Sequence, residues 1–142
     1  MEEHVTLDIP AKAEYVVLGR LALAGLLRDR PFSQAAVADL KLAITEACSN
    51  SIRHAYDAAE VDGQVHLSFM VTDESIVVGV RDEGPGFDAS EDAPGALNAV
   101  GGPQLSEGGM GISIIRSVVD DFALERCAGG GTGLTFTKLA DA

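Results

Sequence analysis

One long amphipathic segment constrains the fold of this chain more than any other feature of its sequence. At helical spacing, one side of residues 34–56 is largely apolar and consists of Val37, Leu40, Ile44, Cys48, Ser51 and Ala55. The opposite side is a narrow polar stripe that consists of Asp39, Glu46, Asn50, Arg53 and Asp57. A helix with one apolar face must bury that face against another layer of structure. The sequence therefore predicts a layered domain in which this helix covers a second layer.

Strand-like alternation surrounds the long helix. Apolar and polar residues alternate over residues 5–9, 65–80 and 122–136, and turn residues divide each of the last two ranges into a hairpin. Further helices are expected over residues 13–27 and from about 110 to 119. This order indicates an α+β two-layer sandwich, with a mixed, mainly antiparallel sheet and helices on one face. No linker or repeat divides the chain, so residues 1–142 are expected to form one domain.

Charge and composition exclude several classes of function. The net charge is −12 and the isoelectric point is near 4.4, which opposes direct nucleic-acid binding because phosphate contacts need clustered Lys and Arg. Such a surface suits a basic protein partner, and it equally serves solubility. The acidic N-terminal residues do not resemble a secretory signal, and no apolar run is long enough to span a membrane, so a cytoplasmic protein is expected. Cys48 and Cys127 lack zinc-type spacing and are expected to be buried free thiols.

The polar stripe of the long helix contains a candidate metal and catalytic pair. Glu46 and Asn50 are one helical turn apart, so their side-chain oxygens can point to the same place. Mg²⁺ prefers oxygen ligands of this kind. Taken alone, the same spacing also describes an ordinary solvated helix face.

The segment DEGPGF, residues 82–87, is a candidate base-binding loop. Asp82 follows a predicted strand and precedes two glycines, Gly84 and Gly86, which allow a ligand to approach the backbone closely. A carboxylate at this position can accept a hydrogen bond from the exocyclic amine of adenine. A plain turn at the end of a strand would have a similar composition.

The segment GGMGI, residues 108–112, leads into the predicted third helix. Glycines before a helix expose backbone N–H groups and the positive end of the helix dipole, which suits a di- or triphosphate. A flexible connection into a helix is the alternative. The preceding residues, about 88–109, are rich in Ala, Gly, Ser and Pro and too long for an ordinary connection, so a mobile lid is expected there.

In their order and separation, these three segments resemble the N, G1 and G2 boxes of the GHKL (Bergerat-fold) superfamily of ATPases and kinases. Within it, the runs DLKLAITEACSNSIRHAY and EYVVLGRLALAGL resemble the anti-sigma-factor serine-protein kinases of the stress-response and sporulation type. The resemblance extends over residues 5–139. It implies ATP and Mg²⁺ as cofactors and the GHKL two-layer fold.

The resemblance also implies a role for individual residues. Glu46 would be the general base, and Asn50 would coordinate Mg²⁺. Asp82 would bind the adenine amino group, in a pocket shaped by Gly84, Gly86 and Thr132. The phosphates would be enclosed by Gly108, Gly109, Met110, Gly111 and Ile112. Arg20 would contact a sigma factor. Apart from the resemblance, Arg53 on the polar stripe, Mg²⁺ or an Arg supplied by a partner could provide positive charge to the nucleotide.

The implied activity is a protein serine/threonine kinase that sequesters a sigma factor and phosphorylates a STAS-type anti-sigma antagonist, as a homodimer built through the sheet edge or the first helix. One feature keeps a second hypothesis open: no Lys or Arg occurs between Arg81 and Arg116, whereas phosphoryl transfer depends on positive charge. The alternative is a nucleotide-binding anti-sigma switch without efficient kinase turnover. A detached histidine-kinase catalytic domain shares the three boxes but fits the upstream helices poorly, and His54 is expected to be structural.

Overall fold

The computed structural model describes residues 2–55, 63–83, 110–126 and 131–142. In chain order the elements are β1 (Glu3–Pro10), the 3₁₀ turn η1 (Ala13–Tyr15), α1 (Val16–Leu27), α2 (Gln34–Ala55), β2 (Gln64–Val71), β3 (Ser75–Asp82), α4 (Met110–Val118), β5 (Asp121–Arg126) and β6 (Thr132–Leu139). The lid expected over residues 88–109 lies outside the described residues, as do Gly84, Gly86, Gly108, Gly109 and Cys127.

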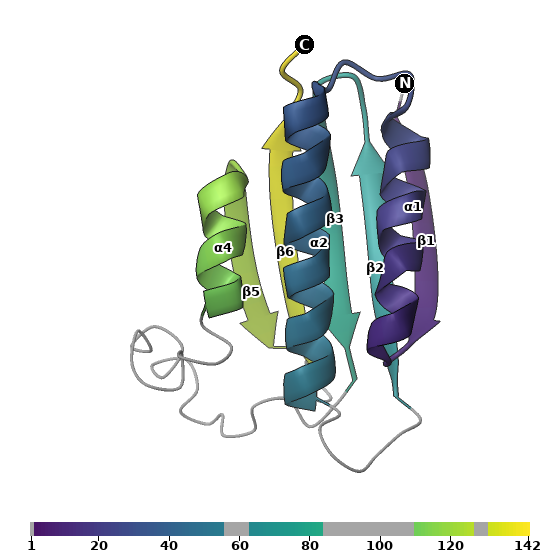
Figure 1. Ribbon diagram of the computed structural model, residues 1–142, viewed down its shortest axis with the longest axis vertical. Coiled ribbons are helices and arrows are strands. Elements are labelled where there is room, and N and C mark those ends of the chain that lie inside the picture. The colour runs from purple at the N-terminus through teal and green to yellow at the C-terminus, as the bar shows by residue number, and fades with distance from the viewer. Residues whose placement is uncertain (1, 56–62, 84–109, 127–130) are drawn as a thin grey trace.

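The described strands form one five-stranded sheet in the order β1-β2-β3-β6-β5. Every pairing among them is antiparallel, so the parallel pair of a mixed sheet is not found in this part of the chain. All the described helices lie on one face of the sheet, with α1 over β1 and β2, α2 over the centre and α4 over β5 (Figure 1). The predicted α+β two-layer sandwich is confirmed.

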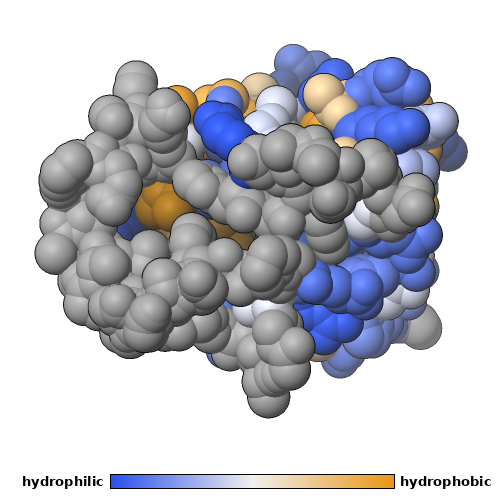
Figure 2. Space-filling model, turned by 90° about the horizontal axis from the view of Figure 1, so that it is seen from below, coloured by the Kyte–Doolittle hydropathy of each residue, from blue (hydrophilic) through white to orange (hydrophobic). Residues whose placement is uncertain are grey.

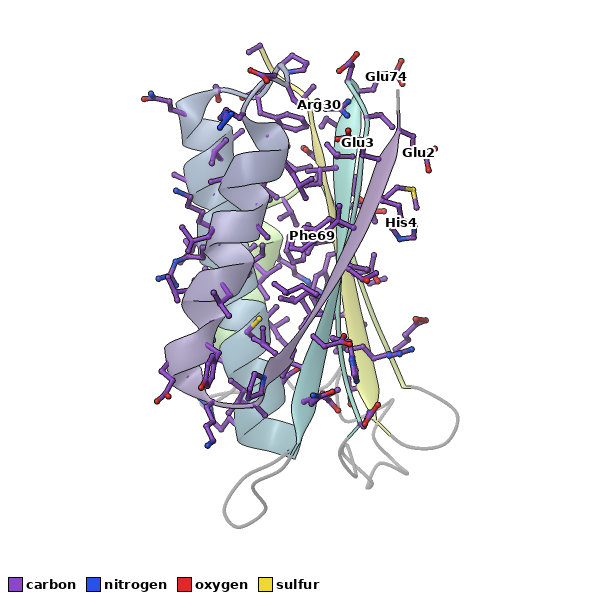
Figure 3. All side chains as sticks on the ribbon, turned by 90° about the vertical axis from the view of Figure 1, so that its right-hand side faces the viewer. Glu2, Glu3, His4, Arg30, Phe69 and Glu74 are labelled. Atoms are coloured by element: carbon purple, nitrogen blue, oxygen red, sulfur yellow. The ribbon has the colours of Figure 1, made fainter. Side chains whose placement is uncertain are left out.

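The core lies between the helices and the sheet. Alternate residues of β2 and β3 face the helices and are buried, as the apolar alternation in the sequence predicts. Phe69 is fully buried and points from the sheet toward the helix layer (Figure 3). From α2, Leu40, Ile44 and Cys48 enter the same core.

Local signals place the ends of the helices where the sequence predicts them, with one difference. Ser33 caps α2, since its Oγ accepts a hydrogen bond from the backbone N–H of Ala36 at 3.0 Å. The first predicted helix starts differently: Ala13–Tyr15 form a 3₁₀ turn, and the α-helix begins at Val16. No helix among the described residues is long and apolar enough to cross a membrane.

One end of the sandwich gathers the segments that carry the candidate chemistry. The C-terminal end of α2, the C-terminal end of β3, the start of α4 and the start of β6 all lie at the lower end in Figure 1. Both chain termini lie at the opposite end. Segments far apart in the sequence therefore meet at one edge of the sandwich.

Candidate functional site

Asp82 is the buried carboxylate at the centre of this lower end. It is the last residue of β3 and only 3% exposed. Its Oδ2 accepts a hydrogen bond from Ser51 Oγ on α2 at 3.1 Å, and its Oδ1 accepts one from the backbone N–H of Thr132 on β6 at 3.1 Å. A buried carboxylate needs such donors. Its orientation is therefore fixed by α2 on one side and by β6 on the other.

Gly131 brings β6 close to Asp82. Its φ of +96° is in the region that favours glycine, and a Cβ at this position would overlap the backbone carbonyl oxygen of Asp82. The next residue, Thr132, has a buried Oγ1 with no hydrogen-bond partner in the described part of the chain. A buried hydroxyl without a partner is rare in proteins and is available to a ligand.

Asn50 provides a second buried polar atom without a partner. The residue is 9% exposed, and its Oδ1 accepts no hydrogen bond from any described residue. An amide oxygen is a good ligand for Mg²⁺, so the residue fits the metal role that the resemblance implies. The described residues contain no group of three or more His, Cys, Asp or Glu side chains that could hold a metal by themselves.

Glu46 lies one turn before Asn50 on α2 and faces the first turn of α4. A Cβ built on Gly111 would lie 3.0 Å from Glu46 Oε1, so the absence of a side chain at Gly111 allows this close approach. The first turn of α4 contains no acidic residue. The first N–H groups of a helix have no partner within the helix and its dipole is positive there, so this turn can bind an anion near Glu46.

The described members of the predicted site lie along two contacts made by the C-terminal half of α2. Gly111 at the start of α4 approaches Glu46. Further along α2, Ser51 follows Asn50 and bonds to Asp82, which is bonded in turn to Thr132 of β6.

The other predicted residues flank these contacts. Met110 and Ile112 belong to the start of α4, and Arg53 is exposed near the end of α2. Figure 2 shows this end face on, where the visible described surface is mainly hydrophilic with a smaller apolar area. The glycines at positions 84, 86, 108 and 109 lie outside the described residues.

Arg20, the predicted partner-binding residue, lies on α1 and contacts α2 at Thr45, the residue before Glu46. Its Nη1 donates to Thr45 Oγ1 on α2 at 3.0 Å, and Thr45 Oγ1 in turn donates to the carbonyl oxygen of Lys41. The side chain is half-buried. It joins the two helices and still reaches the surface.

Sequence reasoning missed two members of the site. Ser51 falls on the core side of α2, and a hydroxyl on an otherwise apolar face was the available signal. Gly131 is the second, and nothing in its run of glycines distinguishes it from its neighbours.

Comparison with protein families gives a match over residues 9–138 to the histidine kinase-like ATPase domain. The chain is 35% identical over 131 residues to a serine-protein kinase RsbW from Listeria monocytogenes, covering 87% of this chain and 80% of the relative. It is 33% identical over 139 residues to an RsbW from Bacillus pumilus, covering 95% of this chain and 85% of the relative.

A solved structure agrees on the fold. The RsbU and RsbW domains of a Mycobacterium tuberculosis protein match 99% of this chain with a TM-score of 0.67 at 17% sequence identity. The match covers 33% of that longer chain. The similarity is to the architecture described above.

Proposed function

This chain belongs to the histidine kinase-like ATPase family, and from that premise we propose that it is an anti-sigma factor with ATP-dependent serine-protein kinase activity. The observation that carries the proposal is that α2 places Glu46 against Gly111 at the start of α4 and, beside Asn50, bonds through Ser51 to the buried Asp82. The relatives that match most of its length are named serine-protein kinases.

Adenine recognition rests on Asp82. Its carboxylate is held by Ser51 and by the Thr132 backbone, so it can accept a hydrogen bond from the exocyclic amine without reorienting. Guanine carries a carbonyl oxygen in place of that amine, and two acceptors would face each other. The buried Thr132 Oγ1 offers a second polar contact in the same pocket.

Glu46 is the proposed general base. It takes the proton of the attacking serine hydroxyl while the serine oxygen forms a bond to the γ-phosphorus and the bond from that phosphorus to the bridging oxygen of ADP breaks. Glu46 is half-buried and lies against the first turn of α4. Base and phosphate-binding helix are therefore adjacent, as an in-line displacement requires.

Asn50 is the proposed Mg²⁺ ligand, through its unpartnered Oδ1. When bound, the metal supplies positive charge to the phosphate oxygens. The N–H groups at the start of α4 add to this, and Arg53 is the exposed cation nearest to Asn50 along α2. Gly108 and Gly109 precede α4 and are proposed to close on the phosphates, and Gly84 and Gly86 are proposed to shape the adenine pocket.

The proposed partners are a sigma factor and a STAS-type antagonist, and α1 offers a surface for a protein. Val17, Leu18 and Leu21 are 40%, 40% and 62% exposed, with Leu42 of α2 at 40%. Exposed apolar side chains beside Arg20 are typical of a docking surface. We propose that the sigma factor binds to this surface of α1. We also propose that the protein acts in the cytoplasm. A homodimer through a sheet edge or α1 is also proposed.

A nucleotide-dependent switch without efficient turnover is the second candidate. The observation that favours it is the absence of Lys and Arg between Arg81 and Arg116. It predicts binding of ATP and of the partner, with no phosphorylated product.

The deciding experiment is incubation with γ-labelled ATP, Mg²⁺ and the STAS-type protein. We expect a labelled serine with the wild type, no label with Glu46→Gln, and unchanged labelling with Glu125→Gln, an exposed residue of β5. Glu46→Gln should still bind ATP. Equal labelling by Glu46→Gln would remove Glu46 from the mechanism, and ATP binding without any label would favour the switch.

A further inference from the structure

Lys138 connects three elements of the fold at the end of α4 that is remote from the phosphate site. It is the seventh residue of β6, and its side chain is 17% exposed. Its Nζ donates a hydrogen bond to the backbone oxygen of Val118 at 2.7 Å and lies 3.3 Å from Asp39 Oδ2 on α2. Val118 is the last residue of α4, so the ammonium group satisfies a carbonyl that has no partner within the helix.

The turn after α4 is also fixed to β6. The backbone N–H of Asp120 donates to the Thr137 carbonyl at 2.8 Å, and Asp120 Oδ2 accepts from the backbone N–H of Leu139 at 2.8 Å. These two bonds join α4 to the sheet. Lys138 adds α2 to the same junction through Asp39.

The two points at which α2 and α4 are held together are equally spaced along both helices. On α2, Asp39 precedes Glu46 by seven residues, and on α4, Gly111 precedes Val118 by seven residues (46 − 39 and 118 − 111). Since each residue adds about 1.5 Å along a helix, both intervals are about 10 Å long. The two helices run in opposite directions, so fixing Val118 beside Asp39 fixes Gly111 beside Glu46.

We propose that Lys138 is a positioning residue for nucleotide binding: by holding the end of α4 against Asp39, it sets the register in which the first turn of α4 meets Glu46 and the phosphates. This inference rests on the proposed function. Lys138 acts through α4 and touches neither Glu46 nor Asp82. Asp39 belongs to the polar stripe of α2 and has no role in the chemistry. In this proposal its role is to hold Lys138.

Removal of the ammonium group tests the proposal. In Lys138→Met the aliphatic stem is retained, and we expect the affinity for ATP to fall by about tenfold, the scale of one charge-assisted hydrogen bond. The affinity for adenosine should stay within about twofold of the wild type, because adenosine lacks the phosphates and its base contacts Asp82 on β3. Competition against a fluorescent ATP analogue measures both ligands.

Two further variants separate positioning from folding. Lys138→Arg retains a donor and should restore most of the ATP affinity, and Asp39→Asn, which retains the bond to Val118, should give a smaller loss than Lys138→Met. The matched control is Arg30→Met, which removes another cation from the end of the molecule remote from the nucleotide site (Figure 3); Arg30 pairs there with Glu3 and Asp73 at 3.1 Å each. The control should lower the melting temperature and leave both affinities unchanged.

The outcomes are distinct. An unchanged ATP affinity in a folded Lys138→Met would overturn the proposal, and so would an equal loss of ATP and adenosine binding. If Lys138→Met did not fold, an Asp39→Asn with full ATP affinity would overturn it instead. A wild-type protein that bound neither ligand would overturn the proposed function itself.

Discussion

Ser51 donates a hydrogen bond from its Oγ to Asp82 Oδ2 over 3.1 Å, and this bond joins the long helix to the end of the central strand. The other carboxylate oxygen is bonded to the backbone of Thr132. The carboxylate that would recognise adenine therefore has a donor on each oxygen and is oriented before any ligand arrives. Preorganisation of this kind reduces the entropy that binding costs.

Replacement of Ser51 by Ala should weaken ATP binding by about tenfold, since a hydrogen bond to a charged group contributes about 1.5 kcal/mol and a factor of ten corresponds to about 1.4 kcal/mol. Titration calorimetry of the wild type and the variant measures the effect. Ser117→Ala, an exposed serine of α4, is the control. Identical affinities for wild type and Ser51→Ala would show that this bond has no part in nucleotide binding.

Replacement of Gly111 by Ala should separate stability from activity. A Cβ there would lie 3.0 Å from Glu46 Oε1, so the carboxylate must move away from its position. Folding should not suffer, because Ala is favoured over Gly inside a helix by about 0.5–1 kcal/mol. We expect an equal or higher melting temperature and a turnover reduced by about tenfold, on the scale of a general-base contribution of about 10²–10⁴ that is partly lost.

The control for this variant is Gly25→Ala in α1, where a Cβ would meet nothing within 4 Å. It should gain stability and retain full turnover. If both variants lost turnover, the cause would be the replacement of a helical glycine in general and not the contact between residue 111 and Glu46.

His66 makes the stability of the fold depend on pH. Its Nδ1 is 2.8 Å from Asp8 Oδ1 and its Nε2 is 2.9 Å from Glu83 Oε2, beside a hollow of about 460 Å³ on the helix-free face that Arg81 and Glu125 also line. Burial lowers the pKa of His66, but the hydrogen bonds and negative charges of the two carboxylates raise it by more, and the net shift is upward.

A folded-state pKa above the unfolded value means that the protonated form stabilises the fold. This stabilisation is present below the unfolded pKa of about 6.5 and is lost as the pH rises through the higher folded pKa. The melting temperature should therefore fall as the pH rises above about 6.5 and through the higher folded-state pKa of His66, and less so in His66→Gln. NMR titration that gave His66 a pKa at or below its ordinary value would contradict this.

Cys48 should be inert in the native protein. It is a free, fully buried thiol, and burial raises its pKa to about 12, with the charge of Arg20 opposing the shift. Because the thiolate is the nucleophile, alkylation needs unfolding. Peptide mass spectrometry after iodoacetamide treatment should find Cys48 modified only when denaturant is present. Modification in native conditions would mean that α2 opens readily.

The individual helices and strands could be predicted because they follow from the spacing of apolar residues along the sequence. The alternation of Ile76, Val78 and Val80 predicts β3, and it also assigns Asp82 to the buried face of that strand. Strand order could not be predicted in this way. The pairing of β3 with β6 joins Arg81 to Gly133, and no local pattern encodes such a distant partner.

The site was only partly predictable for a similar reason. A helical projection divides α2 into two sides, whereas the folded helix contacts the sheet, α1 and α4. Asn50 therefore lies buried although it belongs to the polar stripe, and Ser51 reaches a carboxylate although it belongs to the core side. Both positions depend on neighbours that only the tertiary structure supplies.

The most direct test of the account is the binding of ATP in the presence of Mg²⁺ by the wild type and by Asp82→Asn. In the variant one carboxylate oxygen becomes an NH₂ group, which donates and cannot accept, so the side chain no longer accepts hydrogen bonds through both of its terminal atoms and its negative charge is lost. The account therefore predicts wild-type binding that weakens by at least about tenfold in the variant. Equal binding by both proteins, or no binding by the wild type, would contradict the assignment of this end of the sandwich as a nucleotide site.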